Sequence, residues 1–301
     1  MSGAQIEILA IAACTAVACA LVGTFLVLRR LAMVSDAISH SILPGIVIGF
    51  VITGDLTSPW LVVGAAATGV LTVALVEALT RTRRLKEDAA MGLVFPALFS
   101  LGVVLITRYA GDVHLDVDAV LLGELAFAPF NRLEVGGADL GPRGLWLMAS
   151  IMLLNLLAVS LFYKELKLAT FDAGLAAALG FAPTAIHYGL MSLVSLTAVG
   201  AFDAVGLILV VALMIGPPAA AYLLTDRLAV MLGLSALLGA VAAALGFWWA
   251  TVLDASIAGC MAVAVGVVFG VVFLVAPGRG LLAVLRRRRR QRWRFAQLML
   301  A

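Results

Sequence analysis

Asp36 and His40 lie four residues apart in the otherwise apolar segment LAMVSDAISHSILPG. On a helix this spacing projects both side chains from one face, within reach of a shared ion. A carboxylate and an imidazole suit Mn²⁺, Fe²⁺ or Zn²⁺ better than Cu⁺, which favours sulfur ligands. Two ligands are too few for a tight structural site, so the pair predicts transient cation binding. Alternatively, Asp36 caps a helix and His40 bonds a neighbouring carbonyl.

A second group of possible metal ligands lies in the segment HLDVDAVLLGELAF and comprises His114, Asp116 and Asp118. These residues alternate along a possible strand, or His114 and Asp118 share one face of a helix. Either geometry could hold a cation loosely, and the acidic charge alone could attract cations without a defined site. A merely solvated loop is the alternative explanation.

Other polar residues carry weaker signals. Glu77 and Asp203 are isolated acids within or beside apolar segments, and each is expected to cap, pair or line a pathway. His187 is explained by snorkelling to lipid headgroups near the end of a span, and we assign it no site role. The three cysteines form no C-x-x-C pair, and the sequence contains neither a G-x-x-x-x-G-K-[ST] loop nor H-E-x-x-H. We therefore expect no enzyme activity and no ATP hydrolysis by this chain.

The elements that must position these residues are membrane-spanning helices. Of the 301 residues, 64% are hydrophobic and only 12% are charged, and the mean hydropathy is +1.15. Apolar blocks of about 20 residues can each cross a hydrocarbon core about 30 Å thick. We predict an all-α polytopic membrane helix bundle with spans near 6–28, 37–53, 59–80, 89–109, 144–163, 184–202, 203–223, 227–249 and 255–276.

The number of spans is eight or nine. Only GAFDAVG separates the blocks at 184–202 and 203–223, so one of them is a candidate re-entrant half-helix. Residues 1–276 form the expected transmembrane domain, and the first block is interpreted as a retained helix because no A-x-A cleavage pattern follows it. Residues 277–301 form a basic cytoplasmic tail, whose RRRRRQRWR run suits anionic lipid headgroups better than nucleic acid.

Charge predicts the orientation. If every block crosses, the basic residues share one side, which is the cytoplasm; they include Arg29, Arg30, Arg81, Arg227 and the tail. The opposite side holds the acidic segment 111–142. The N-terminus is then outside.

Two proline motifs predict a hinge or gate, and a short polar segment predicts a cytoplasmic helix. LPG, with Pro44 and Gly45, and GPP, with Pro217 and Pro218, should break their helices and border a pathway as a hinge or gate. The stretch YKELKLATFDAGLAAALGF at 163–181 predicts a short cytoplasmic helix that ends in a turn at Gly180. That helix could be plain loop structure or a docking point for a partner.

Several motifs together resemble the permease subunit of ATP-binding-cassette importers for zinc and manganese, the ABC-3 family. They are FLVLRRLAMVSDAISHSILPGIVIGF, with its D-x-x-x-H-x-x-x-P-G element, FDAGLAAALGF, VGLILVVALMIGPPAAAYLLTDRL and the outer HLDVDAVLLGE. Their order and spacing match over nearly the whole chain. One departure is Asp203, near which zinc-importing relatives are expected to carry a basic or neutral residue.

The resemblance implies roles for several residues. Asp36 and His40 would line the translocation route and touch Mn²⁺ or Zn²⁺ in transit, with iron as a further candidate and no permanently bound cofactor. The coupling helix, at about 170–181, would insert into the ATPase through Phe171, Asp172, Leu175, Leu179 and Gly180.

The implied partners are a cytoplasmic ABC ATPase dimer, an extracytoplasmic metal-binding protein, and a second permease that is either a copy or a paralogue. The implied location is the bacterial inner membrane. The alternative within transport is a proton-coupled carrier that works without an ATPase and uses buried acids such as Glu77 and Asp203. An intramembrane hydrolase is disfavoured, because GxGD and HExxH are both missing.

Overall fold

The computed structural model describes residues 3–54, 58–109, 125–135 and 138–285, and within these ranges nine helices are long and apolar enough to cross a membrane. The all-α polytopic prediction is therefore confirmed. The helices are α1 (Gly3–Leu28), α2 (Ala32–Ser41), α3 (Leu43–Thr53), α4 (Pro59–Arg81), α5 (Glu87–Tyr109), α7 (Arg143–Leu161), α8 (Tyr163–Phe171), α9 (Ala173–Ala178), α10 (Pro183–Val205), α11 (Leu207–Leu224), α12 (Leu228–Leu253) and α13 (Ile257–Val275).

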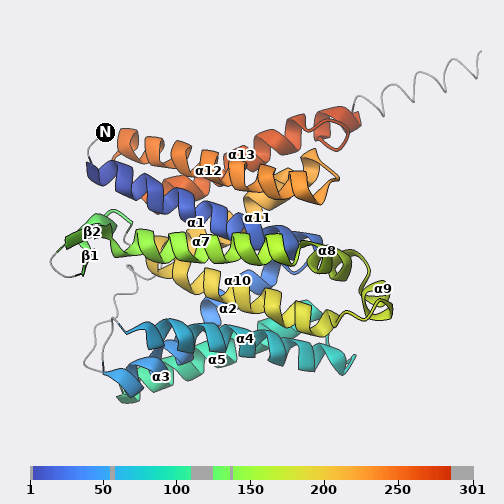
Figure 1. Cartoon of the computed structure of the whole chain (residues 1–301), viewed down its shortest axis with the longest axis horizontal. Coiled ribbons are helices and arrows are strands. Elements are labelled where there is room, and N and C mark those ends of the chain that lie inside the picture. The colour runs from blue at the N-terminus through green and yellow to red at the C-terminus, as the bar shows by residue number, and fades with distance from the viewer. Residues whose placement is uncertain (1–2, 55–57, 110–124, 136–137, 286–301) are drawn as a thin grey trace, which may run out of the picture.

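The helix α1 lies between α12 and α7 (Figure 1). It packs against α7, α10, α11 and α12, while α3, α4 and α5 pack against one another in a separate layer. Small residues allow the close approach. A β-carbon added at Gly23 would lie 1.9 Å from the carbonyl oxygen of Met214 on α11. In a membrane such small-residue contacts replace the hydrophobic driving force between helices.

The second span consists of two helices. The α2 helix ends at Ser41 and α3 begins at Leu43, with Pro44 in the first turn of α3. Gly45 then packs against α4, since a β-carbon there would lie 2.1 Å from the Gly64 carbonyl oxygen. The sequence placed this span at 37–53, whereas the apolar helical stretch runs over Ala32–Thr53.

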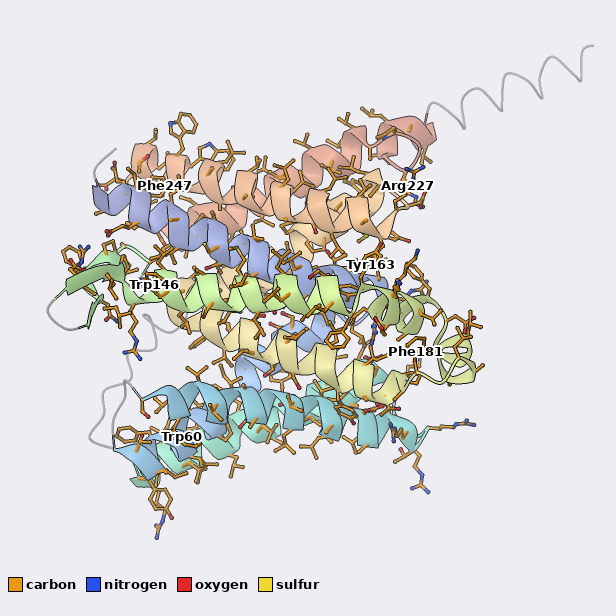
Figure 2. The ribbon with its side chains drawn as sticks, in the orientation of Figure 1. Trp60, Trp146, Tyr163, Phe181, Arg227 and Phe247 are labelled. Carbon is orange, nitrogen blue, oxygen red and sulfur yellow. The ribbon has the colours of Figure 1, made fainter. Side chains whose placement is uncertain are left out.

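The two ends of the bundle differ in chemistry. Figure 2 shows Tyr163, Phe181 and Arg227 at one end and Trp60, Trp146 and Phe247 at the other. The N-terminus lies at the end with the tryptophans (Figure 1). The connections after α1 and α4 carry arginines and turn at the end marked by Arg227. By the positive-inside rule this end is cytoplasmic.

Of the two alternatives for the number of spans the structure has nine in the described residues, and one expected helix break is corrected. The blocks on either side of GAFDAVG are both full spans, α10 and α11, because only Gly206, with φ of 79°, separates them and reverses the chain. Neither is a half-helix. In addition, α11 runs through Pro217 and Pro218 without interruption. Each proline removes one backbone hydrogen bond, while the bonds of neighbouring residues can persist.

A small β-hairpin on the outer side was not predicted. Its strands are β1 (Arg132–Val135) and β2 (Ala138–Pro142). The Nε of Arg132 lies 2.6 Å from the Asp139 carboxylate, and its Nη2 lies 3.3 Å from Glu7 on α1. The hydrogen bond from the Arg132 guanidinium lowers the pKa of Asp139. The hairpin is thereby tied to the outer end of α1.

Candidate functional site

The predicted pair lies on α2 as the spacing required. The Nε2 atom of His40 is 3.6 Å from Oδ1 of Asp36, and the two side chains are 34% and 39% exposed, respectively. The His40 ring also packs near Phe95 of α5, with ring centroids 5.6 Å apart. Neighbouring positions of α2, including Val34 and Ile38, are buried. Asp36 and His40 therefore lie on the outward face of α2 in the single chain.

Buried hydroxyl groups hold the opposite face of α2. The Ser35 hydroxyl donates to the Met214 sulfur at 3.0 Å, which joins α2 to α11. The Ser41 hydroxyl lies 2.6 Å from the Thr72 hydroxyl of α4, and both residues are buried. Hydrogen bonds between helices resist sliding and rotation. These two contacts set which face of α2 is directed outwards.

The backbone next to His40 is also unusual. Pro44 has no N–H group, so the helical bond that position 44 would make to the His40 carbonyl cannot form. The helix assignment is interrupted at Ile42, between His40 and Pro44. The carbonyl of His40 is thus released from one helical donor within the same turn as the imidazole.

The pair does not by itself form a complete metal site. Among the residues that the structure describes, no three His, Cys, Asp or Glu side chains are grouped as metal ligands would be. His114, Asp116 and Asp118 lie outside the described residues. A cation at Asp36 and His40 would need further ligands from water, from the backbone or from another chain.

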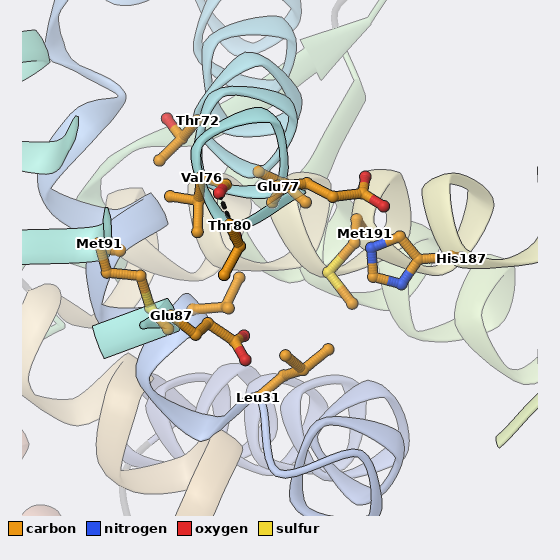
Figure 3. Close-up of a pocket in the computed structure, with 12 residues that line it drawn as sticks. Leu31, Thr72, Val76, Glu77, Thr80, Glu87, Met91, His187 and Met191 are labelled. Carbon is orange, nitrogen blue, oxygen red and sulfur yellow. Dashed lines mark hydrogen bonds between the residues drawn. The ribbon is translucent and has the colours of Figure 1, made fainter. Parts of the chain in front are cut away.

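A cavity of about 250 Å³ lies nearer the cytoplasmic end, between α2, α4, α5 and α10 (Figure 3). Its polar lining includes Glu77, Glu87 and His187, and its apolar lining includes Met91 and Met191. Figure 3 shows the Glu77 carboxylate beside the His187 ring, with the Glu87 carboxylate across the cavity. Asp36 and His40 are not among its lining residues.

The Glu77 carboxylate lines the cavity and also accepts two side-chain hydrogen bonds. Its Oε1 atom accepts a hydrogen bond from Arg81 at 2.8 Å, and its Oε2 atom accepts one from the Tyr188 hydroxyl of α10. This carboxylate therefore joins α4 to α10. For Asp203, the structure describes only its backbone position in the last turn of α10.

Sequence reasoning missed a polar contact centred on Arg29. Its Nε atom donates to the Thr170 hydroxyl of α8 at 3.1 Å, and its Nη1 atom lies 3.3 Å from Nδ1 of His187. The expectation that His187 snorkels to headgroups is wrong, because its ring is half-buried beside Arg29. The pattern gave no signal for these contacts, since the three residues lie far apart in the sequence.

The predicted cytoplasmic helix is present at α8 and α9. The Asp172 carboxylate caps α9 by accepting from the Leu175 N–H at 2.8 Å. The helix ends in a turn where Gly180, with φ of 87°, follows Leu179. The N–H of Phe181 bonds the Ala176 carbonyl at 3.0 Å, which closes the turn.

The exposed side chains of this segment are apolar. Phe171 is 62% exposed, Leu175 47% and Leu179 61%. They lie at the cytoplasmic end of the bundle, beyond α7 and α10 (Figure 1). The segment thus contains two short helices that meet at Asp172, and the second ends in the expected turn, while its role in coupling stays a prediction.

The nine apolar helices within the described residues define a multi-pass membrane protein. Residues 5–276 match the model of the ABC 3 transport family, and the chain belongs to this family. It is therefore a membrane permease.

Two relatives and one solved structure show the extent of the similarity. The chain is 50% identical over 88% of its length to the manganese transport system membrane protein MntD of Bacillus subtilis, covering 90% of that protein. It is 52% identical over 91% of its length to the zinc transport system membrane protein TroD of Treponema pallidum, covering 74% of that protein. Its fold matches a chain of PsaBC from Streptococcus pneumoniae, solved with a Fab, with a TM-score of 0.78, 27% identity, and coverage of 94% and 96% of the two chains.

Proposed function

We propose that this chain is the membrane-spanning subunit of an ATP-driven importer for a divalent transition metal, Mn²⁺ or Zn²⁺. The observation that carries the proposal is the Asp36–His40 pair on one face of α2, 3.6 Å apart. Both donor types are common to Mn²⁺ and Zn²⁺ sites. Relatives that are half identical to this chain are named for transport of one or the other metal.

The depth of the pair supports a place on the translocation route. His40 lies eight residues into α2, which is about 12 Å along the helix from its cytoplasmic start. An ionisable side chain at such depth is costly in hydrocarbon and usually faces protein or water. The exposed face of α2 is therefore expected to border a second permease, either a copy or a paralogue, and not lipid.

A second permease would also complete the ligand set. One chain supplies two side chains, and a two-fold arrangement would bring two such pairs to the same axis. The backbone carbonyl of His40 lacks the helical hydrogen bond from position 44, and its oxygen would be a further ligand for the metal. A conducting site must bind the ion weakly enough to release it, which suits ligands that are shared between two mobile chains.

The remaining partners follow from the two ends of the bundle. The exposed apolar side chains of Phe171, Leu175 and Leu179 would insert into a cytoplasmic ATPase, because removing exposed apolar surface from water is favourable. An extracytoplasmic binding protein would deliver the metal near the acidic segment 111–142. Pro44 with Gly45, where the second span is interrupted, would permit the bending that opens one side and closes the other.

The test is metal uptake by the complex reconstituted in vesicles. Asp36→Asn is expected to lower ATP-dependent uptake of Mn²⁺ and Zn²⁺ roughly tenfold or more, the scale of losing one charged ligand contact. Asp254→Asn is a matched control, because Asp254 is exposed and lies on the outer side after α12. Unchanged uptake in Asp36→Asn would remove the pair from the route.

The same vesicles separate the proposal from a proton-coupled carrier. Wild-type uptake should require the ATPase and ATP. Uptake by the purified chain alone, driven by a pH gradient without ATP, would instead favour the secondary carrier.

A further inference from the structure

Arg29 occupies the connection between the first span and the helix that carries Asp36 and His40. The end of α1 is closed by two backbone bonds, from Arg30 N–H to the Val27 carbonyl at 3.1 Å and from Leu31 N–H to the Leu26 carbonyl at 2.8 Å. Arg30 takes a left-handed conformation with φ of 62° to allow this turn. The connection is therefore tight, and α2 begins three residues after Arg29.

The Arg29 side chain contacts two other elements. It donates from Nε to Thr170 at the end of α8 and approaches His187 of α10 with Nη1. Within the described part of the chain, its Nη2 atom is buried and has no hydrogen-bond partner. Burial lowers the pKa of this guanidinium. A half-buried guanidinium with one buried, unsatisfied nitrogen costs stability, so packing alone does not explain an arginine at this position.

These contacts join the cytoplasmic segment to the bundle. Thr170 lies two residues before Asp172, the residue that caps α9. The residue after His187, Tyr188, donates to Glu77 of α4, and Glu77 and His187 both line the cavity. A displacement of α8–α9 can therefore move α2, because Arg29 contacts α8 and its backbone leads directly into α2. The same displacement can move α4, because Arg29 contacts α10 and α10 is bonded to α4.

We propose that Arg29 is a positioning residue that transmits movement of the α8–α9 segment to α2, and so sets the amount of metal moved per ATP hydrolysed. The inference rests on the proposed function, because it requires an ATPase that docks on α8–α9. Arg29 itself does not touch the metal. The test therefore measures the coupling itself.

The experiment uses the full permease–ATPase complex in vesicles and records metal uptake and ATP hydrolysis on the same sample. Arg29→Gln is expected to lower the uptake per ATP roughly tenfold, within the range typical of coupling between sites. The ATPase should still co-purify in normal amount. Thr170→Val removes only the acceptor hydroxyl and should lower the same ratio by a few-fold.

Two comparisons make the result specific. Arg30→Gln changes the neighbouring arginine, whose side chain is exposed, and should leave uptake per ATP unchanged. The double variant of Arg29→Gln with Thr170→Val should lose no more than Arg29→Gln alone, because both changes remove one shared contact.

The outcomes also separate this inference from the proposed function. If uptake per ATP stays at the wild-type value in Arg29→Gln, or if both changes act additively, the positioning role is refuted while the importer assignment stands. If wild-type vesicles take up no metal with ATP, the importer assignment itself fails. Should Arg29→Gln fail to assemble, Thr170→Val decides the question, since an unchanged ratio in that variant also overturns the proposal.

Discussion

Several polar side chains inside the bundle form contacts between helices. The Asn155 amide of α7 donates to the Ala18 carbonyl of α1 at 3.2 Å and to the Thr197 hydroxyl of α10 at 2.8 Å. Asn155 and Thr197 are fully buried. One amide therefore joins three spans, where no water can substitute for the lost bonds.

The Asn155 contact gives a stability prediction. Asn155→Leu keeps the branched shape of the side chain but removes both donors, and it should destabilise the chain by about 1 kcal/mol, the scale of such bonds in membranes. Thermal unfolding of the detergent-solubilised protein would measure the loss. Ser160→Ala on the exposed face of α7 is the control. Equal stability of Asn155→Leu and wild type would contradict this role.

At the scale of elements, glycine contacts determine how closely the helices approach. The α1–α11 contact at Gly23 has no room for a β-carbon, because the Met214 carbonyl would lie 1.9 Å away. The α2–α11 hydrogen bond from Ser35 ends on the sulfur of the same Met214. The position of α2 thus depends on the tight α1–α11 contact.

Gly23→Ala should therefore force α1 and α11 apart. We expect a loss of stability of about 1–3 kcal/mol, as for overpacking in a core. Gly233→Ala in α12 is the matched control, because no atom lies within 4 Å of a β-carbon added there. A Gly23→Ala variant as thermostable as Gly233→Ala would show that the helices can separate at no cost.

At the scale of the whole molecule, the nine spans of the described chain place the α8–α9 segment and the residue after α12 at opposite ends of the bundle. The α8–α9 segment lies at the end of the bundle with Arg227, and Asp254 follows α12 at the other end. The arginine-rich connections assign the first end to the cytoplasm. The α8–α9 segment and the ATP-rich compartment are then on the same side.

This orientation can be checked with single cysteines. In a background with Cys14, Cys19 and Cys260 replaced by alanine, Leu175→Cys should react with a membrane-impermeant maleimide only after the cytoplasmic side is exposed. Asp254→Cys should react in intact cells. Labelling of Leu175→Cys in intact cells would invert the topology and place the proposed ATPase site outside.

Part of this architecture could be predicted from the sequence because it depends on local properties. Hydropathy over 20 residues sets a span wherever it occurs, so the block at 6–28 corresponds to α1 and that at 255–276 to α13. The second span was predicted to begin at residue 37 but begins at Ala32. Its first turns contain Ser35, Asp36, Ser39 and His40, which lower the local hydropathy although neighbouring helices cover most of that surface.

The spacing of Asp36 and His40 and the cap and turn around α9 were likewise determined by the sequence, since a helical turn involves only neighbouring residues. Only the tertiary structure decided that Pro217 lies inside a continuous helix, that Glu77 is paired with Tyr188, and that Arg29 meets Thr170 and His187. These contacts join residues 111 to 158 positions apart. Their existence depends on how the helices pack, and helix packing is a property of the whole surface of each span and not of any short segment.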